Sequence, residues 1–314
     1  MPDSLKIIKT DEIVYFGAEQ PLPPYGCCNL GSLDITKFVV NGNLDYGLLQ
    51  KAVEIAVRTL DKVIDINNYP VYEIEKWAKE NRPIGLGIMG WADYLLMLKI
   101  AYGSKESIEE LEKVLAFIYS VAVNESIRLG KELGVPIRCK KLPTPRRNIT
   151  VMTIAPTGTI SLIAGCSSGI EPIFSEITIR NDKTGSYQFE HDLANQSYFR
   201  CAVAVNGAKE VTWDEHVNTL AAAQRHIDSG VSKTCNVPQN TRRETIEKIL
   251  FSAWENKCKG ITIYRNNSRQ VEVLSPKEVL MPSRAFIVFN ALTIERLWLL
   301  VVDGLNALTG IHCF

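Results

Sequence analysis

The sequence has no excess of charge of either sign, because 35 basic and 35 acidic residues cancel to a formal net charge of zero. Nucleic acids and anionic membranes attract proteins through basic clusters, so this balance gives no reason to expect either partner. The chain also lacks an uninterrupted run of about 18 apolar residues, the length that a membrane-spanning helix needs. The nearest approach, Ala285 to Val302, is interrupted by Glu295 and Arg296. Any anion that this protein binds must therefore be held by a few local groups.

Cysteine is too sparse for a disulfide scaffold, with eight residues in a chain of 314,. No Cys-x-x-Cys pair and no Cys/His spacing typical of a metal centre is present, so no metal site is expected. The first sixteen residues carry charges throughout and do not contain the apolar core of a signal peptide,. We therefore expect a cytoplasmic protein, in which thiols stay reduced and a functional cysteine is more often redox-active or catalytic than structural.

What the sequence does contain is an alternation of helical and extended patterns, which is typical of an α/β fold. Apolar residues at helical spacing and helix-capping residues predict helices over 44–67, 91–98, 104–133, 213–229 and 241–256,. Short apolar runs predict strands over 148–154, 177–180 and 259–264, whereas the prolines and glycines of 19–32 predict a loop,.

One segment after a predicted strand has the composition of a phosphate-binding loop. It contains three hydroxyl residues and a glycine, and a second small turn, Gly165 to Gly169, follows it. A strand that ends in such a loop and starts a helix directs free N–H groups at one point, where a phosphate is well placed. A plain strand-to-helix turn explains the same residues, and no Walker A motif is present. The segment is Ala155, Pro156, Thr157, Gly158, Thr159, Ile160 and Ser161.

A pair of adjacent cysteines, Cys27 and Cys28, lies in the loop predicted near the N-terminus. Neighbouring cysteines rarely form a disulfide with each other, because the bridge is strained. Two partly buried thiols explain the pair, and so does one reactive thiol whose partner lies elsewhere in the fold. Glu19 precedes the pair and would be a solvated charge unless it belongs to the same site as Cys28.

Several further motifs appear in a fixed order along the chain. They are EQPLPPYGCCNLGSLDI (19–35), RPIGLGIMGWADYLL (82–96), RNITVMTIAPTGTIS (147–161), SSGIEPIF (167–174), VSKTCNVP (231–238) and KGITIYRNNSR (259–269). Together they resemble the C-terminal part of the ribonucleotide reductase large (catalytic) subunit, and they are most similar to its adenosylcobalamin-dependent branch. On this resemblance, residues 19–274 would form the C-terminal barrel region, with an unmatched segment at 1–18 and an unmatched apolar tail at 275–314.

The resemblance implies a partial ten-stranded barrel with surrounding helices and a finger loop inside it. It implies that ribonucleotides are reduced to deoxyribonucleotides by thiyl-radical chemistry, with adenosylcobalamin as cofactor and a thioredoxin-like or other dithiol as reductant. The loop from Ala155 to Ser161 would bind the substrate phosphates. Cys28 would be one of the reducing cysteine pair, and Glu19 would handle a ribose hydroxyl proton.

The sequence departs from this family at the finger loop, which there has the pattern Asn-Xaa-Cys-Xaa-Glu. Counting back from Glu19, the radical cysteine is replaced by Gly17 and the asparagine by Tyr15. We therefore expect the isolated chain to be inactive, with a missing N-terminal half or a homo-oligomer as the completing partner. A catalytically dead nucleotide-phosphate-binding module and a non-functional truncated product are the alternatives. Tyr264 stands alone where the iron-dependent relatives have two adjacent tyrosines, which favours cobalamin.

Overall fold

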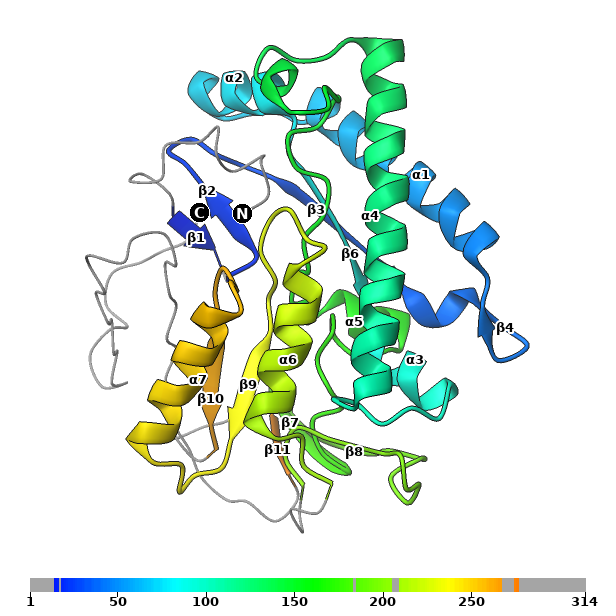
Figure 1. Cartoon of the computed structure of the whole chain (residues 1–314), viewed down its shortest axis with the longest axis vertical. Helices are drawn as coiled ribbons and strands as arrows, with labels where there is room; N and C mark the ends of the chain where they lie inside the picture. Colours follow the sequence, from blue (N-terminus) through cyan, green and yellow to red (C-terminus); the bar gives the residue numbers. More distant parts are fainter. Residues whose placement is uncertain (1–13, 17, 183–184, 205–208, 267–273, 277–314) are drawn as a thin grey trace.

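The structure is a computed structural model that describes residues 14–16, 18–182, 185–204, 209–266 and 274–276 (Figure 1). Helices and strands alternate along most of this chain. In order they are β1 (Val14–Phe16), β2 (Gln20–Leu22), β3 (Asn29–Asp34), the 3-10 helix η3 (Ile35–Phe38), β4 (Val39–Val40), β5 (Asn43–Leu44), α1 (Tyr46–Ile66), α2 (Tyr72–Asn81), β6 (Ile84–Met89), α3 (Trp91–Met97), α4 (Lys105–Leu133), η4 (Cys139–Lys141), α5 (Ile160–Ala164), β7 (Ile177–Asp182), β8 (Gly185–Glu190), α6 (Trp213–Gln224), β9 (Thr234–Val237), α7 (Arg243–Glu255), β10 (Thr262–Arg265) and β11 (Leu274–Pro276).

A row of parallel extended segments forms the centre of the molecule. β3 pairs with β6 in parallel. On its other side, β6 pairs with the extended segment 150–154 through a parallel bridge between Leu86 and Met152. A second parallel bridge, between Ile154 and Val231, joins this segment to residues that run on into β9. β9 in turn pairs in parallel with β10. The α/β class expected from the sequence is confirmed, while the described residues do not close into a barrel.

The helices cover one face of this sheet. α1 packs on β3 and β6, α6 packs on β9, and α4 contacts both α1 and α6, so that the long α4 lies across the molecule in Figure 1. The sequence of β6 explains which face is covered. Ile84, Leu86 and Ile88 are buried in the main hydrophobic core, whereas Gly85 and Gly87 alternate with them and therefore face the other side.

The β1–β2 hairpin lies against that other face. The carbonyl oxygen of Glu19, in the turn, accepts hydrogen bonds from the N–H of Gly230 and the hydroxyl of Thr153, both at 2.8 Å. Glycine is required beneath the turn, because a Cβ on Gly230 would lie 2.1 Å from the carbonyl oxygen of Ala18. A Cβ on Gly260 would lie 2.8 Å from the Ala18 side chain. The hairpin tip is thus seated directly on the central segments.

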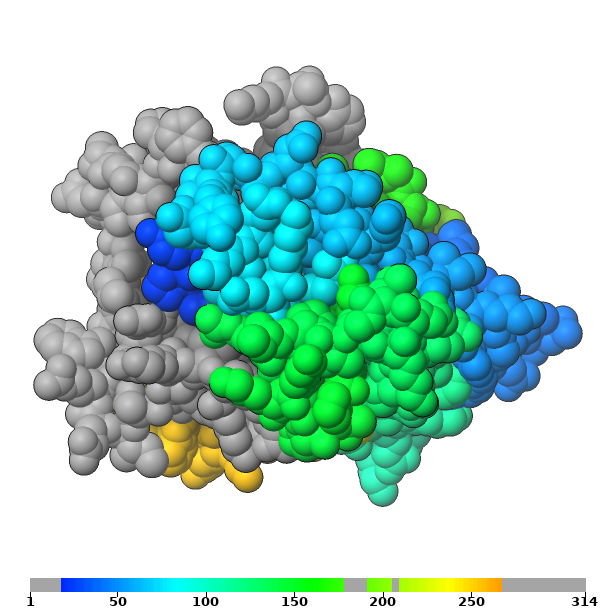
Figure 2. Space-filling view, turned by 90° about the horizontal axis from the view of Figure 1, so that it is seen from above, coloured from blue at the N-terminus to red at the C-terminus, as the bar shows by residue number. Residues whose placement is uncertain are grey.

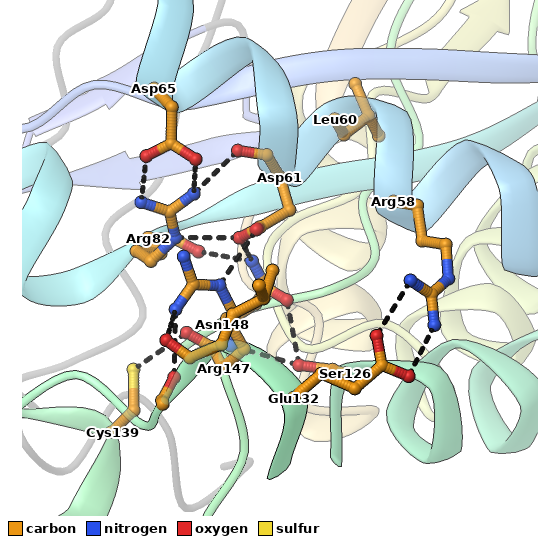
Figure 3. A network of polar contacts seen from close by, with 12 residues as sticks. Arg58, Leu60, Asp61, Asp65, Arg82, Ser126, Glu132, Cys139, Arg147 and Asn148 are labelled. Carbon is orange, nitrogen blue, oxygen red and sulfur yellow. Dashed lines mark hydrogen bonds and ion pairs between the residues drawn. The ribbon is translucent and has the colours of Figure 1, made fainter. Parts of the chain in front are cut away.

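A buried ionic network fixes the strands to the helices at the end where α2 lies (Figure 3). Arg82, which ends α2, donates to Asp61 of α1 at 2.8 Å, and Arg147 donates to the other oxygen of Asp61 at 2.9 Å. Asn148 donates to Asp61 at 2.8 Å. Burial raises the pKa of Asp61, but the hydrogen bonds and charges of Arg82 and Arg147 outweigh it, so the net pKa is below its usual value.

This network joins segments that are distant in sequence. Figure 2 shows α1 and α2 (blue to cyan) side by side with the green surface at the end of α4 and the segment after it. Arg147 also donates to the carbonyl oxygens of Leu133 and Gly134, at 3.0 and 2.9 Å, and so ties the end of α4 to the start of the segment 150–154. The position of that segment is therefore set by ionised groups as well as by apolar packing.

Two expectations from the sequence require correction. Residues 19–32 are not simply a loop, since they contain β2 and the first part of β3. Proline and glycine exclude a helix interior but are compatible with short strands, and Gly31 faces Leu60 of α1 without a clash,. The predicted helix 213–229 ends at Gln224. The chain turns there, and the Asp228 carboxylate then accepts hydrogen bonds from the N–H groups of Val151 and Met152.

Candidate functional site

A pocket of about 250 Å³ lies where the strands end. One wall consists of Leu30, Gly31 and Ser32 from β3, and the other is the loop that follows Ile154. The carboxyl ends of adjacent parallel segments meet at this edge of the sheet, which is where ligands bind in many α/β proteins. The residues of the loop that line the pocket are Ala155, Thr157, Gly158, Thr159 and Ile160.

The loop has the local conformation that its composition predicted, because it leads directly into α5 with Thr159 as the N-cap residue. Among the described residues, the backbone N–H groups of Gly158 and Thr159 find no hydrogen-bond acceptor. A Cβ on Gly158 would meet nothing within 4 Å, so this glycine faces open space. Two unpaired donors beside a pocket can bind an anion.

The hydroxyls of the loop have a different role from the one that composition suggested. Thr157 has a left-handed backbone, with φ of 55°, and its hydroxyl accepts the N–H of Gly169 at 2.8 Å. The Ser161 and Ser168 hydroxyls lie 2.9 Å apart. These two side chains hold the second turn, 165–169, against the loop. Of the three hydroxyls, that of Thr159 is left for a ligand.

Asp93 of α3 supports the second turn, a role that no motif of the sequence indicated. Its carboxylate accepts the N–H of Ser167 at 2.5 Å, and the carbonyl oxygen of Ser167 accepts the N–H of Gly90 at 2.7 Å. Burial raises the pKa of Asp93, but hydrogen bonds from His191 and Ser167 outweigh it and lower the net pKa. The carboxylate therefore stays ionised and keeps the turn in place.

Glu19 is held by its backbone, while its side chain is left without a partner. Within the described residues, the buried Oε2 atom of Glu19 makes no hydrogen bond. Burial raises the pKa of this carboxyl, and a hydrogen bond from its own backbone opposes the shift only in part. A carboxyl with a raised pKa, on a hairpin tip against the sheet, is suited to exchange a proton with a bound ligand.

Cys28 lies one residue before β3, and the pocket wall begins at Leu30, further along the strand. Asn29 donates to the carbonyl oxygen of Leu60 in α1 at 2.8 Å, so by alternation Cys28 and Leu30 face the hairpin side. Burial raises the pKa of the Cys28 thiol well above its ordinary value, and the nearby Cys27 and Asp228 raise it further. Cys27 packs against the main core instead. Four residues of strand at about 3.3 Å each separate Cys28 from Ser32 by about 13 Å.

Comparisons with known proteins show the family of the chain. A family profile described as "Ribonucleotide reductase, barrel domain" matches residues 17–141 and 142–264. The chain belongs to the ribonucleotide reductase barrel-domain family. The matched ranges include the hairpin turn, Cys28, the 155–161 loop and the parallel segments between them. All of the site residues expected from the sequence therefore fall within the barrel-domain match.

Among curated relatives, the chain is 39% identical over 290 residues to the vitamin B12-dependent ribonucleoside-diphosphate reductase of Thermoplasma acidophilum, which covers 82% of this chain and 38% of the relative. It is 36% identical over 298 residues to the enzyme of the same name from Mycobacterium tuberculosis, covering 83% of this chain and 43% of the relative. It is 32% identical over 202 residues to the ribonucleoside-diphosphate reductase subunit alpha of Chlamydia pneumoniae, covering 51% of this chain and 19% of that protein. The chain thus spans less than half the length of these curated relatives.

Residues 14–266, apart from the gaps given above, contain no group of three or more His, Cys, Asp or Glu side chains that could hold a metal ion. Among the helices that the structure describes, none is both long enough and apolar enough to cross a membrane.

Proposed function

We propose that this ribonucleotide reductase barrel region binds a ribonucleoside diphosphate along the hairpin face of its sheet and supplies a reducing thiol. The observation that supports this most is the alignment of three features on one face. The 155–161 loop lies at the carboxyl end of the strands, the turn with Glu19 lies across their middle, and Cys28 lies at their start. A nucleotide with its phosphates on the loop would extend its ribose toward Glu19 and Cys28.

In this proposal each group has a defined chemical task. The N–H groups of Gly158 and Thr159 and the Thr159 hydroxyl donate to phosphate oxygens at the start of α5. Glu19 exchanges a proton with a ribose hydroxyl, which its raised pKa favours,. Cys28 stays a protonated thiol because its pKa is raised. Its sulfur therefore carries the hydrogen that the reduction requires.

The overall reaction balances with two thiols. Replacement of the ribose 2′-hydroxyl by hydrogen releases water and oxidises two thiols to one disulfide, of which Cys28 would contribute one sulfur. An external dithiol of the thioredoxin type would then reduce the disulfide. The second thiol would come from a missing N-terminal half or from a second copy of the chain, which would also complete a ten-stranded barrel around the parallel segments described here.

The names of the relatives favour adenosylcobalamin, which supplies the radical that starts such a reduction when it is bound. The residue at position 17 does not fit this chemistry, because glycine has no sulfur to accept the radical. We therefore propose that the chain as given does not turn over. Neither adjacent thiol is proposed as a substitute, since Cys27 packs against the core and Cys28 is needed as reductant.

The glycine at position 17 also supports a second candidate function. A nucleotide-phosphate-binding module that has lost catalysis would keep the 155–161 loop and dispense with a sulfur at position 17. A non-functional truncated product is the remaining alternative. A continuous buried core that runs from Ile35 to Ile263 favours a folded chain over that alternative.

A binding measurement with Gly158→Ala tests the proposed phosphate site. The added methyl group meets no protein atom within 4 Å, so the thermal midpoint should not change, whereas a phosphate on the loop would be displaced. We expect calorimetry to show at least fivefold weaker binding of CDP and of pyrophosphate, on the order of one lost hydrogen bond. Gly47→Ala, in the first turn of α1, is the matched control and should bind both ligands unchanged. Equal affinity of Gly158→Ala and the unchanged chain would exclude the loop as the phosphate site.

A further inference from the structure

Gln20 has a side-chain amide nitrogen that makes no hydrogen bond within the described residues. Its side chain is 5% exposed, and its Nε2 atom is buried without a hydrogen bond in the described part of the chain. Burying an amide costs free energy unless hydrogen bonds replace those made with water, so buried amides in folded proteins are nearly always paired. An apolar side chain would fill the same position at lower cost. The amide therefore indicates a polar partner that is not among the described residues.

The surroundings of this amide connect it with the pocket. Gln20 begins β2 directly after the turn, and its Nε2 atom lies over Gly85 of β6. A Cβ on Gly85 would lie 3.2 Å from Gln20 Nε2, 2.7 Å from Leu30 Cδ2 and 2.6 Å from Thr153 Cγ2. Leu30 also lines the pocket. The amide thus lies beside Leu30, which is one of the residues that line the pocket, in a space that exists because residue 85 is glycine.

A second unpaired polar atom lies on the same face of β3. Within the described residues, Ser32 Oγ is buried without a hydrogen bond, and Ser32 lines the pocket beside the 155–161 loop. Together with Glu19 Oε2, three buried polar atoms of β3 and the hairpin thus have no partner within the described residues. A single elongated polar ligand would satisfy all three groups.

We propose that Gln20 is a specificity-determining residue that contacts the ribose hydroxyls of a nucleoside diphosphate whose phosphates lie on the 155–161 loop. This inference rests on the proposed function. An amide offers a donor and an acceptor side by side, and a hydroxyl also donates and accepts, so the two are complementary. Phosphate is held further along, at the N–H groups of the loop, and the ribose is the next part of the ligand toward the hairpin.

The test compares binding of CDP, its 2′-deoxy and 3′-deoxy analogues, ADP and pyrophosphate to the purified chain, by calorimetry. We expect the unchanged chain to bind CDP more tightly than at least one deoxy analogue. Gln20→Met keeps the length and apolar volume of the side chain and removes the amide. Gln20→Met should lower the ratio of the affinities for CDP and that deoxy analogue by about three- to tenfold, toward a value of one. Its affinity for pyrophosphate should be unchanged.

Two further variants keep the result interpretable. Gly85→Ala displaces the amide without altering it and should reduce the same preference. Gln50→Met, on the exposed surface of α1 where Gln50 donates to Glu54 at 2.9 Å, is the matched control and should change nothing. If pyrophosphate binds and Gln20→Met still prefers CDP over the deoxy analogue as strongly as the unchanged chain does, Gln20 does not contact the ribose. Only this inference is then wrong. A changed ranking of CDP against ADP, with deoxy discrimination intact, would place Gln20 on the base and also overturn it. Absence of pyrophosphate binding in the unchanged chain would instead contradict the proposed function.

Discussion

At the scale of single residues, Glu19 shows how position on the fold changes chemistry. Its raised pKa means that the folded state binds a proton more tightly than the unfolded state does. The carboxylate therefore lowers the stability of the fold as the pH rises above the ordinary carboxyl range, since the unfolded state then holds fewer protons. The same feature that suits Glu19 for proton exchange makes it costly to bury.

Glu19→Gln should for this reason be at least as stable as the unchanged chain at pH 7. The gain should shrink as the pH falls toward the ordinary carboxyl range, where the native side chain is protonated and neutral. Urea unfolding at pH 7 and pH 5 measures both free energies of unfolding. The free energy of unfolding of the variant minus that of the unchanged chain is the quantity to compare. A lower value of this difference at pH 7 than at pH 5 would mean that the fold stabilises the carboxylate.

Some residue roles could be predicted from the sequence and others could not. The 155–161 loop was identified from its small and hydroxyl residues, because local composition decides such a turn. The use of the Thr157 and Ser161 hydroxyls within the fold was not predictable, since it depends on where the turn 165–169 packs. Asp93 and Gln20 gave no signal, because a lone polar residue in a sequence does not show whether it has a partner.

At the scale of elements, the hairpin and the sheet depend on each other. The helices with strong periodicity and caps were predicted closely, as for α4, which starts after Ser104 and ends before Gly134. The helix α2 and the strands β1 and β2 were missed. α2 is rich in charged residues and only partly buried, and short hairpin strands are defined by pairing and not by their own composition.

Gly230→Ala should separate the hairpin from the sheet. Its Cβ would lie 2.1 Å from the carbonyl oxygen of Ala18, and relief of such an overlap costs about 1–3 kcal/mol of folding free energy. We expect a lower thermal midpoint and faster proteolysis at residues 14–22, measured by calorimetry and limited digestion. Gly158→Ala, whose methyl group faces open space, serves as the control. An unchanged midpoint and digestion pattern in Gly230→Ala would show that the hairpin is not seated on Gly230.

At the scale of the whole molecule, the order of motifs predicted the family, which the barrel-domain match confirms. The α/β class was also predicted from alternating patterns. The neighbour order of the strands was not, because the bridges from Leu86 to Met152 and from Ile154 to Val231 join distant segments that no local pattern specifies. The expected segment 275–314 lies outside the described residues apart from Ser275 and Pro276 in β11.

The purified chain should form no deoxyribonucleotide from any of the four ribonucleotides with adenosylcobalamin and a dithiol. The reason is the glycine at position 17, since a radical relay needs placement within about 0.5 Å of the productive geometry. Gly17→Cys alone should remain inactive, because in this proposal the second reducing thiol comes from an N-terminal half or from a second copy of the chain. Product analysis by chromatography measures turnover, and deoxyribonucleotide formation would show that another cysteine receives the radical.

The most direct measurement of the central proposal is a crystal structure of the chain with CDP at saturating concentration. We predict that the phosphates accept hydrogen bonds from the N–H groups of Gly158 and Thr159, and that the ribose lies beside Glu19 and Gln20 on the hairpin face. Phosphates bound elsewhere, or a pocket without nucleotide under these conditions, would contradict the proposal that this face of the sheet is the nucleotide site.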